Sequence, residues 1–127
     1  MRLLETCIYA SDLAAERQFY EGLLGLKCFV YKPPRQAFFR AGEGVFLIFN
    51  PEETRKEGDL PPHGATGSIH VCFAHKPEEL EPLAQKLTKA GYAPVWATWK
   101  NGRSFYVYDP AGNLVEFAPA SIWDIAD

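Results

Sequence analysis

The last regular stretch of the sequence reads Arg103-Ser-Phe-Tyr-Val-Tyr-Asp-Pro-Ala-Gly-Asn-Leu-Val-Glu-Phe117. An apolar and aromatic run is followed by turn-forming residues at 109–113 and by a second apolar run, and this order predicts a β-hairpin. Glu116 interrupts the second run between Val115 and Phe117. A carboxylate in a half-buried strand is costly unless it is paired or bound to a cation. Glu116 is therefore a candidate functional residue.

Two earlier apolar runs contain similar polar interruptions. The run near the N-terminus contains Glu5, and a run in the middle of the sequence contains His70. Because side chains alternate across a strand, Glu5 shares a face with Cys7, and His70 shares a face with Cys72. A strand glutamate commonly reaches solvent, and a buried histidine is commonly hydrogen-bonded and inert. A role for either residue therefore depends on whether they come together.

The order of the predicted elements repeats along the chain. Each half shows a strand, a helix and three further strands. Glu5 and His70 lie 65 positions apart, and Gly25 and Gly91, each placed to end a helix, lie 66 positions apart. Such an offset in a chain of 127 residues predicts an internal duplication. We expect α+β architecture with module 1 at 1–50, a linker at 51–66 and module 2 at 67–127.

Composition excludes several classes of protein. The net charge is −3 and the sequence has no long Lys/Arg cluster, which argues against binding to nucleic acid or to an anionic membrane. No apolar run approaches the roughly 18–20 residues of a membrane span, and the N-terminus lacks the apolar core of a signal peptide. The 3 cysteines lie in apolar runs, which favours reduced thiols and a cytoplasmic location.

The segment from Pro51 to Gly67 is the one loop-like stretch in the sequence. It is rich in charged residues and then in proline and glycine, which predicts a mobile linker or a flap over a cavity. We expect proteases to cut it first, after Arg55 or Lys56. His63 is expected to be a surface histidine.

Four stretches resemble one known family. Glu5-Thr-Cys-Ile-Tyr-Ala-Ser-Asp-Leu13 and Arg17-Gln-Phe-Tyr-Glu-Gly-Leu-Leu-Gly-Leu26 are similar to the opening of vicinal oxygen chelate proteins. Ser68-Ile-His-Val-Cys-Phe73 resembles the first strand of their second module, and Phe105–Phe117 resembles their closing hairpin, with Asp-Pro-x-Gly-x-x-x-Glu as the most specific part. This superfamily includes glyoxalase I, bleomycin-resistance proteins, extradiol dioxygenases and fosfomycin-resistance thiol transferases.

The resemblance implies a fold and a metal site. The fold is a pair of βαβββ modules whose sheets curl round a cavity, commonly in a homodimer. The metal ligands of the family fall on Glu5, His70 and Glu116. One divalent cation (Zn, Ni, Mn or Fe) would satisfy all three polar interruptions and keep open positions for substrate. Tyr106 occupies the tyrosine position of fosfomycin-resistance relatives, so Tyr106 and Glu116 are the expected catalytic residues.

The chain also departs from the family pattern. Many members have histidine where this chain has Glu5. Members with four ligands, such as glyoxalase I, take an acidic group from the fourth strand of module 1, and the nearest equivalent here is Ile48. The missing ligand argues against glyoxalase I activity itself. Bleomycin-binding members lack the metal residues, whereas this chain has them, which argues against pure sequestration.

Other side chains have two interpretations. Cys7 and Cys72 are better explained as small packing residues than as nucleophiles. Lys100 and Arg103 fit either an anion-binding rim or an exposed turn. Tyr106 fits either a catalytic residue or a core aromatic residue. Four aromatic residues fit either a pocket wall or, more simply, the core: Trp96, Trp99, Phe38 and Phe46.

Two functions follow from these patterns. The first is a metal-dependent lyase, isomerase or dioxygenase that binds a small substrate through neighbouring oxygen atoms. The alternative is a bleomycin-resistance-like protein that binds and sequesters a small molecule. Two carboxylates and one histidine would leave a divalent cation near zero net charge, so neutral or monoanionic ligands are expected to bind better than dianions.

Overall fold

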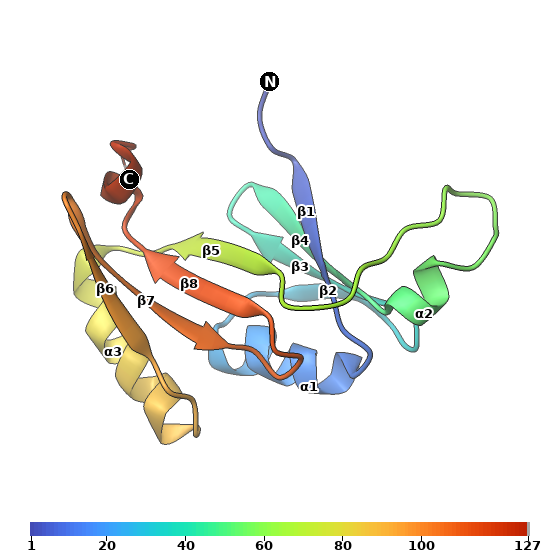
Figure 1. The fold of residues 1–127 in the computed structure, drawn as a ribbon, viewed down its shortest axis with the longest axis horizontal. Helices are drawn as coiled ribbons and strands as arrows, with labels where there is room; N and C mark the ends of the chain where they lie inside the picture. Colours follow the sequence, from blue (N-terminus) through green and yellow to red (C-terminus); the bar gives the residue numbers. More distant parts are fainter. Residues whose placement is uncertain (127) are drawn as a thin grey trace. The chain divides into compact units, whose positions relative to one another are not determined.

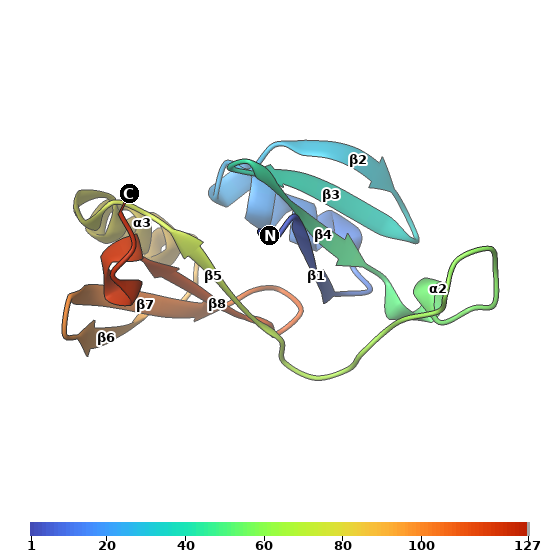
Figure 2. The ribbon, with the colours of Figure 1, turned by 90° about the horizontal axis from the view of Figure 1, so that it is seen from above.

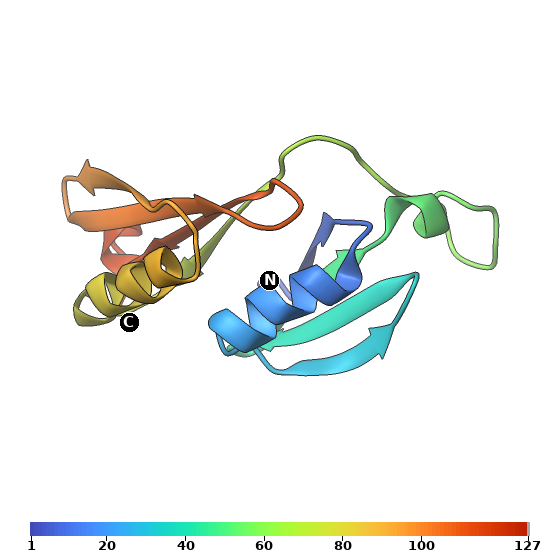
Figure 3. The ribbon, with the colours of Figure 1, turned by 90° about the horizontal axis from the view of Figure 1, so that it is seen from below.

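The computed structural model describes residues 1–126, and the chain divides into two compact units, Met1–Ile69 and His70–Asp127. Each unit contains a four-stranded mixed sheet with helix packed on one face (Figure 1). Views from above and below the first orientation show the helix of each unit against its own sheet (Figures 2 and 3). The α+β class and the two βαβββ repeats predicted from the sequence are confirmed.

The first unit follows the predicted order of elements. Its sheet has the order β1-β4-β3-β2, in which β1 and β4 are parallel and the other pairs are antiparallel. Its elements are β1 (Glu5–Tyr9), α1 (Leu13–Arg17), a π-helical turn (Gln18–Leu23), β2 (Cys28–Lys32), β3 (Gln36–Ala41), β4 (Gly44–Phe49) and α2 (Pro51–Thr54).

Local chemistry explains where the first helix begins and ends. The Asp12 side chain accepts a hydrogen bond from the backbone N–H of Ala15, as an N-cap residue does. Gly25 adopts a positive φ of 79° after the last turn, a conformation that favours glycine. Between these caps, the fully buried Tyr20 packs its ring 4.9 Å from Phe46, measured between centroids. Phe46 is therefore a core residue rather than a pocket wall.

The second unit repeats the arrangement. Its sheet has the order β5-β8-β7-β6, again with one parallel pair, β5 and β8. The Glu79 carboxylate accepts a hydrogen bond from the Lys76 backbone N–H at the start of its helix, and Leu80, Ala84 and Leu87 are buried. Its elements are β5 (His70–Ala74), α3 (Pro77–Lys89), β6 (Val95–Trp99), β7 (Gly102–Tyr108), β8 (Leu114–Ala118) and a 3₁₀ turn (Ala120–Trp123).

The turn of the predicted hairpin is built around a buried aspartate. Asp109 Oδ1 accepts hydrogen bonds from the backbone N–H groups of Ala111 and Asn113, each at 2.9 Å. The Asn113 amide donates to the other carboxylate oxygen at 3.3 Å, and Gly112 has a positive φ of 84°. These bonds fix where β8 begins, and the resulting register places Tyr106 opposite Glu116.

The interval between the modules is more ordered than the sequence suggests. The prediction of a loop is wrong for Pro51–Thr54, which form α2, capped by the Asn50 side chain. The Tyr9 hydroxyl hydrogen-bonds His63 Nδ1 at 2.7 Å. The His63 ring also meets the edge of Phe49 at 4.9 Å between centroids. His63 therefore ties the loop to the first unit, although its side chain lies at the surface. Among residues 1–126, no helix is long and apolar enough to cross a bilayer.

The tie between His63 and Tyr9 leads to a prediction about proteolysis. Tyr9→Phe removes the hydrogen bond that anchors the loop, and a loss of about 1 kcal/mol should open the segment about fivefold more often. Trypsin should therefore cut after Arg55 or Lys56 about fivefold faster in Tyr9→Phe than in wild type, which is measurable by mass spectrometry. Tyr31→Phe serves as the matched control and should not change the rate. Equal cleavage of all three proteins would show that the tie does not restrain the loop.

Candidate metal centre

The register of the second sheet places four chemically active side chains on one face. Glu116 lies in β8 between two neighbouring strands, opposite Cys72 of β5 and opposite Tyr106 of β7. His70 is two residues before Cys72 and therefore shares its face. The predicted neighbours His70, Tyr106 and Glu116 are thus brought together within one unit, and the side chain of Cys72 lies beside them.

His70 is oriented by a backbone carbonyl. Its Nδ1 lies 3.0 Å from the carbonyl oxygen of Leu114, and because a carbonyl can only accept, we assign the proton to Nδ1. The other ring nitrogen, Nε2, faces Glu116 Oε2 at 3.4 Å. In neutral histidine that nitrogen carries a lone pair, so a proton or a metal ion must lie between the two atoms to make the approach favourable.

The geometry fits a divalent metal. Two donors that are each about 2.1 Å from one ion, at a tetrahedral angle, lie about 3.4 Å apart. Glu116 is only 6% exposed, and its Oε1 has no hydrogen-bond partner among residues 1–126. A buried carboxylate oxygen without a partner is costly. His70 Nε2 and Glu116 Oε2 therefore have the spacing of two donors to a first-row transition metal, and the unpartnered Oε1 belongs to the same carboxylate.

Glu5, the third predicted ligand, belongs to the other unit. It is an exposed residue at the start of β1, on the same face as Cys7. Glu5 lies in the first unit, whereas His70 and Glu116 lie in the second, so its role as their fellow ligand stays a prediction. Among residues 1–126, no three His, Cys, Asp or Glu side chains come together in an arrangement that could hold a metal.

The two sheets can be compared position by position. Cys7 pairs with Leu47 in the first sheet, as Cys72 pairs with Glu116 in the second. The sequence comparison that aligned Ile48 with the ligand position is therefore wrong by one residue. Strand register depends on the pairing partner, which the order of residues along one strand does not reveal. The conclusion that module 1 lacks this acidic ligand is unchanged, because leucine has no donor atom.

The environment of Glu116 changes the acidity of its neighbours. Burial, followed by the effect of the Glu116 carboxylate, raises the pKa of the Cys72 thiol to about 12. Burial and then Glu116 also raise the pKa of the Tyr106 hydroxyl above its usual range. Both groups are therefore protonated at neutral pH, which argues against Cys72 as a nucleophile and favours Tyr106 as a hydrogen-bond donor.

Trp96 and Arg103 lie on the helix-facing side of the second sheet, away from the face of Glu116. Trp96 packs against Phe105 on the helix-facing side, at 5.1 Å between ring centroids. Arg103 lies over the Trp96 ring at 4.2 Å and pairs with Glu81 at 3.7 Å. Arg103 alternates with residues 102 and 104 along β7, so it does not share the face of Glu116. The interpretation of Arg103 as an anion-binding rim residue is therefore not supported.

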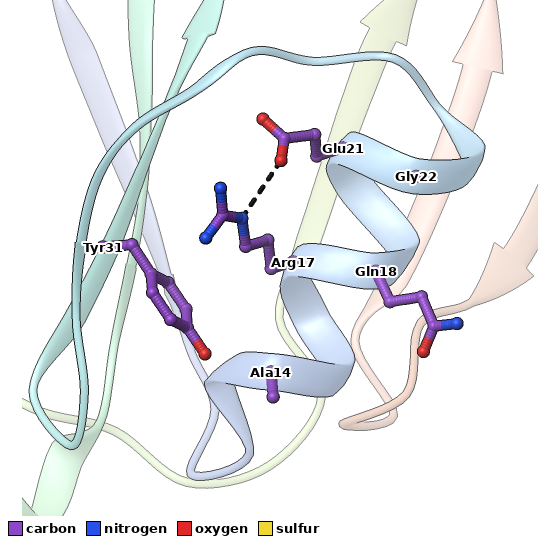
Figure 4. Close-up of a pocket in the computed structure, with 6 residues that line it drawn as sticks. All are labelled: Ala14, Arg17, Gln18, Glu21, Gly22 and Tyr31. Carbon is purple, nitrogen blue, oxygen red and sulfur yellow. Dashed lines mark hydrogen bonds and ion pairs between the residues drawn. The ribbon is translucent and has the colours of Figure 1, made fainter.

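Two surface pockets lie away from these residues. A cavity of about 330 Å³ in the first unit is lined by six residues of the first helix and β2 (Figure 4). In it, Arg17 pairs with Glu21 at 3.0 Å and lies over the Tyr31 ring at 4.7 Å, so its charge is already engaged. A cavity of about 180 Å³ in the second unit is bordered by Trp96 and Pro119. Neither pocket contains His70 or Glu116.

The register of β4 leads to a prediction about two adjacent substitutions. Ile48 is fully buried on the helix-facing side of its sheet, whereas Leu47 pairs with Cys7 on the opposite face. Ile48→Glu would place a charge among core side chains and should lower the free energy of unfolding by more than about 4 kcal/mol. Leu47→Glu is the matched control and should cost clearly less in urea denaturation. A larger loss for Leu47→Glu would reverse the assignment of the two faces.

Comparisons with known proteins agree with this architecture. A family model described as the Glyoxalase/Bleomycin resistance protein/Dioxygenase superfamily matches residues 2–117. The crystal structure of lactoylglutathione lyase from Agrobacterium tumefaciens matches with a TM-score of 0.93 and 32% identity, over 98% of each chain. Glutathione transferase FosA of Serratia marcescens is 31% identical over 113 residues, which cover 88% of this chain and 76% of that protein.

A further relative is a virulence protein of Salmonella typhimurium. It is 26% identical over 123 residues, which cover 92% of this chain and 83% of that protein. The family model covers nearly the whole chain, and both four-stranded sheets fall within the matched residues. The chain therefore belongs to the Glyoxalase/Bleomycin resistance protein/Dioxygenase superfamily.

Proposed function

We propose that this protein is a metal-dependent enzyme that acts on a small molecule bound through two neighbouring oxygen atoms. The observation that carries the proposal is the approach of His70 Nε2 to Glu116 Oε2 at 3.4 Å, beside a buried carboxylate oxygen without a hydrogen-bond partner. The relatives named as a lactoylglutathione lyase and a glutathione transferase support an enzyme rather than a structural protein. The reaction class is a lyase, isomerase or dioxygenase.

The proposed metal ligands are Glu5, His70 and Glu116, and the ion is Zn, Ni, Mn or Fe. When bound, such an ion supplies Lewis acidity that stabilises negative charge on a substrate oxygen. The Leu114 carbonyl holds His70 in the tautomer that presents Nε2. Tyr106, protonated at neutral pH, offers a hydrogen bond to a substrate oxygen on the same face.

The cellular setting is also part of the proposal. All three cysteines are free, which suits a reducing compartment such as the cytoplasm. We further propose a homodimer, as the family resemblance implies. Light scattering on the purified protein would measure the mass in solution, and a mass of one chain would contradict the dimer.

The first prediction from the proposed function concerns the metal content and the stability of the protein. Protein purified without chelators should contain about one equivalent of a transition metal, and Glu116→Gln should lose it. In metal-free protein, the same substitution should raise the melting temperature because it removes a buried charge that lacks full compensation. Glu78→Gln, at an exposed helix position, is the matched control for both measurements.

Two outcomes would contradict this prediction. Wild-type protein that melts at one temperature with and without metal does not hold the ion at His70 and Glu116. Protein that contains no metal but binds small molecules in a melting-temperature screen is the sequestering protein of the alternative function.

The second prediction concerns the charge of the site. Two carboxylates and one neutral histidine leave a divalent cation near zero net charge, whereas Glu5→His would leave it near +1. The variant should therefore bind a phosphonate more tightly, relative to a neutral diol, than the wild type does. Isothermal calorimetry with both ligands on both proteins measures this ratio. The argument fails if the wild type prefers the phosphonate more strongly than Glu5→His does, and a thiol transferase acting on dianions would then be favoured.

A further inference from the structure

Among residues 1–126, four arginines lie over aromatic rings, and Arg40 differs from the other three. The other three also have a side chain that accepts a hydrogen bond or pairs with the guanidinium: Arg17 (Glu21), Arg35 (Gln36) and Arg103 (Glu81). Arg40 lies 3.8 Å from the centroid of the Phe29 ring, and its side chain has no hydrogen bond or ion pair among residues 1–126. Its guanidinium is therefore held against a ring while its N–H donors stay open to a ligand.

Arg40 belongs to the face of the first sheet that is opposite to its helix. Phe39, the preceding residue in β3, is fully buried, and its ring lies 5.9 Å from that of Tyr20 on the helix side. Because side chains alternate along a strand, Phe38 and Arg40 project from the other face. The ring of Phe38 lies 6.4 Å from that of Phe29, measured between centroids. The guanidinium and the two phenyl rings therefore form one cluster on the open face.

A β-bulge brings Phe29 to this cluster. The register of β2 with β3 shifts between Cys28 and Val30, which leaves Phe29 as the extra residue of the strand. Bulges re-aim a side chain and are frequent beside functional sites. Phe29 is 37% exposed and Phe38 is half-buried, so both rings offer apolar surface next to the open donors of Arg40. This combination suits an aromatic ligand with one carboxylate, which a guanidinium can bind through two parallel hydrogen bonds.

The same face carries Glu5, the ligand that the first unit would contribute to the proposed metal site. Glu5 pairs with Val45 of β4, and Val45 pairs on its other side with Arg40. Neighbouring strands lie about 4.8 Å apart, so the Cα atoms of Glu5 and Arg40 are separated by two strand spacings, roughly 10 Å. In the second sheet, the equivalent position across from His70 is Tyr108, which has no charge at neutral pH. The cation is therefore a feature of the first module alone.

We propose that Arg40 is a specificity-determining residue that binds the carboxylate of a monoanionic aromatic substrate, whose two neighbouring oxygens are bound at Glu5. Phe29 holds the guanidinium, and Phe38 offers its ring to the apolar part of the substrate. The substrate class is then an aryl carboxylic acid with two adjacent ring hydroxyls, in which a short chain separates the ring from the carboxylate. The reach to Glu5 rests on the proposed function. The aromatic anion site at Arg40 is a property of the metal-free protein and is tested separately.

The first experiment titrates the metal-free protein with 2-naphthoate and with 2-naphthamide, which has the same ring without the charge, and follows both by ¹H–¹⁵N NMR. Wild type should bind naphthoate about tenfold more tightly, the effect of one charge-assisted contact, with shifts centred on residues 28–30 and 38–41. Arg40→Gln should abolish this preference. Arg103→Gln is the matched control, because Arg103 also lies over an aromatic ring but is paired with Glu81, and it should keep the preference. Equal binding of the two ligands by wild type, or an unchanged preference in Arg40→Gln, would overturn the anion site.

The second experiment uses calorimetry on the zinc-loaded protein with 3-(3,4-dihydroxyphenyl)propanoate and with neutral 4-propylcatechol. Arg40→Gln should weaken binding of the propanoate about tenfold and binding of propylcatechol less than about twofold, with zinc affinity unchanged. Equal effects of the substitution on the two ligands would show that Arg40 does not bind the carboxylate of a substrate held at the metal. Failure of wild type to bind zinc would refute the proposed function and with it the reach to Glu5, whereas the naphthoate titration would still decide the anion site at Arg40.

Discussion

The burial of the Glu116 carboxylate in a central strand is the constraint on which the candidate site depends. In the order β5-β8-β7-β6, β8 has a neighbour on both sides, so Glu116 cannot reach water at a sheet edge. His70 Nε2 lies 3.4 Å from Oε2 of this carboxylate, and Oε1 has no hydrogen-bond partner among residues 1–126. Such a carboxylate is tolerated in a folded protein when another group compensates its charge.

The internal duplication shows that the backbone fold alone does not require a buried carboxylate at this position. The two sheets have the same strand order and the same parallel and antiparallel pairings. At equivalent positions the first sheet has Leu47 and Phe38, and the second has Glu116 and Tyr106. One scaffold thus accommodates an apolar pair at these positions in one module and a polar pair in the other. The chemistry therefore lies in side chains placed on the fold rather than in the fold itself.

The sequence predicted the duplicated architecture, the closing hairpin and the neighbours of Glu116, because alternation along a strand and turn chemistry are local signals. It placed Ile48 one residue away from the equivalent position, because register is set between strands. It missed the tie of His63 to Tyr9 and the bond between Trp99 and Ser104. These contacts join residues whose types carry no pattern, so nothing in the linear order marks them. The place of Glu5 in the metal site stays a prediction.

The position of Arg103 affects which kind of ligand the second sheet can bind. Arg103 lies on the helix-facing side, where it stacks on Trp96 and pairs with Glu81, so its charge is directed away from the face of Glu116. The opposite face instead presents the indole of Trp99 and the hydroxyl of Tyr106. A surface of aromatic rings and neutral donors binds planar, weakly charged molecules better than dianions, which need cations to offset their desolvation. The arrangement of this sheet therefore favours neutral or monoanionic ligands independently of any charge count on the metal.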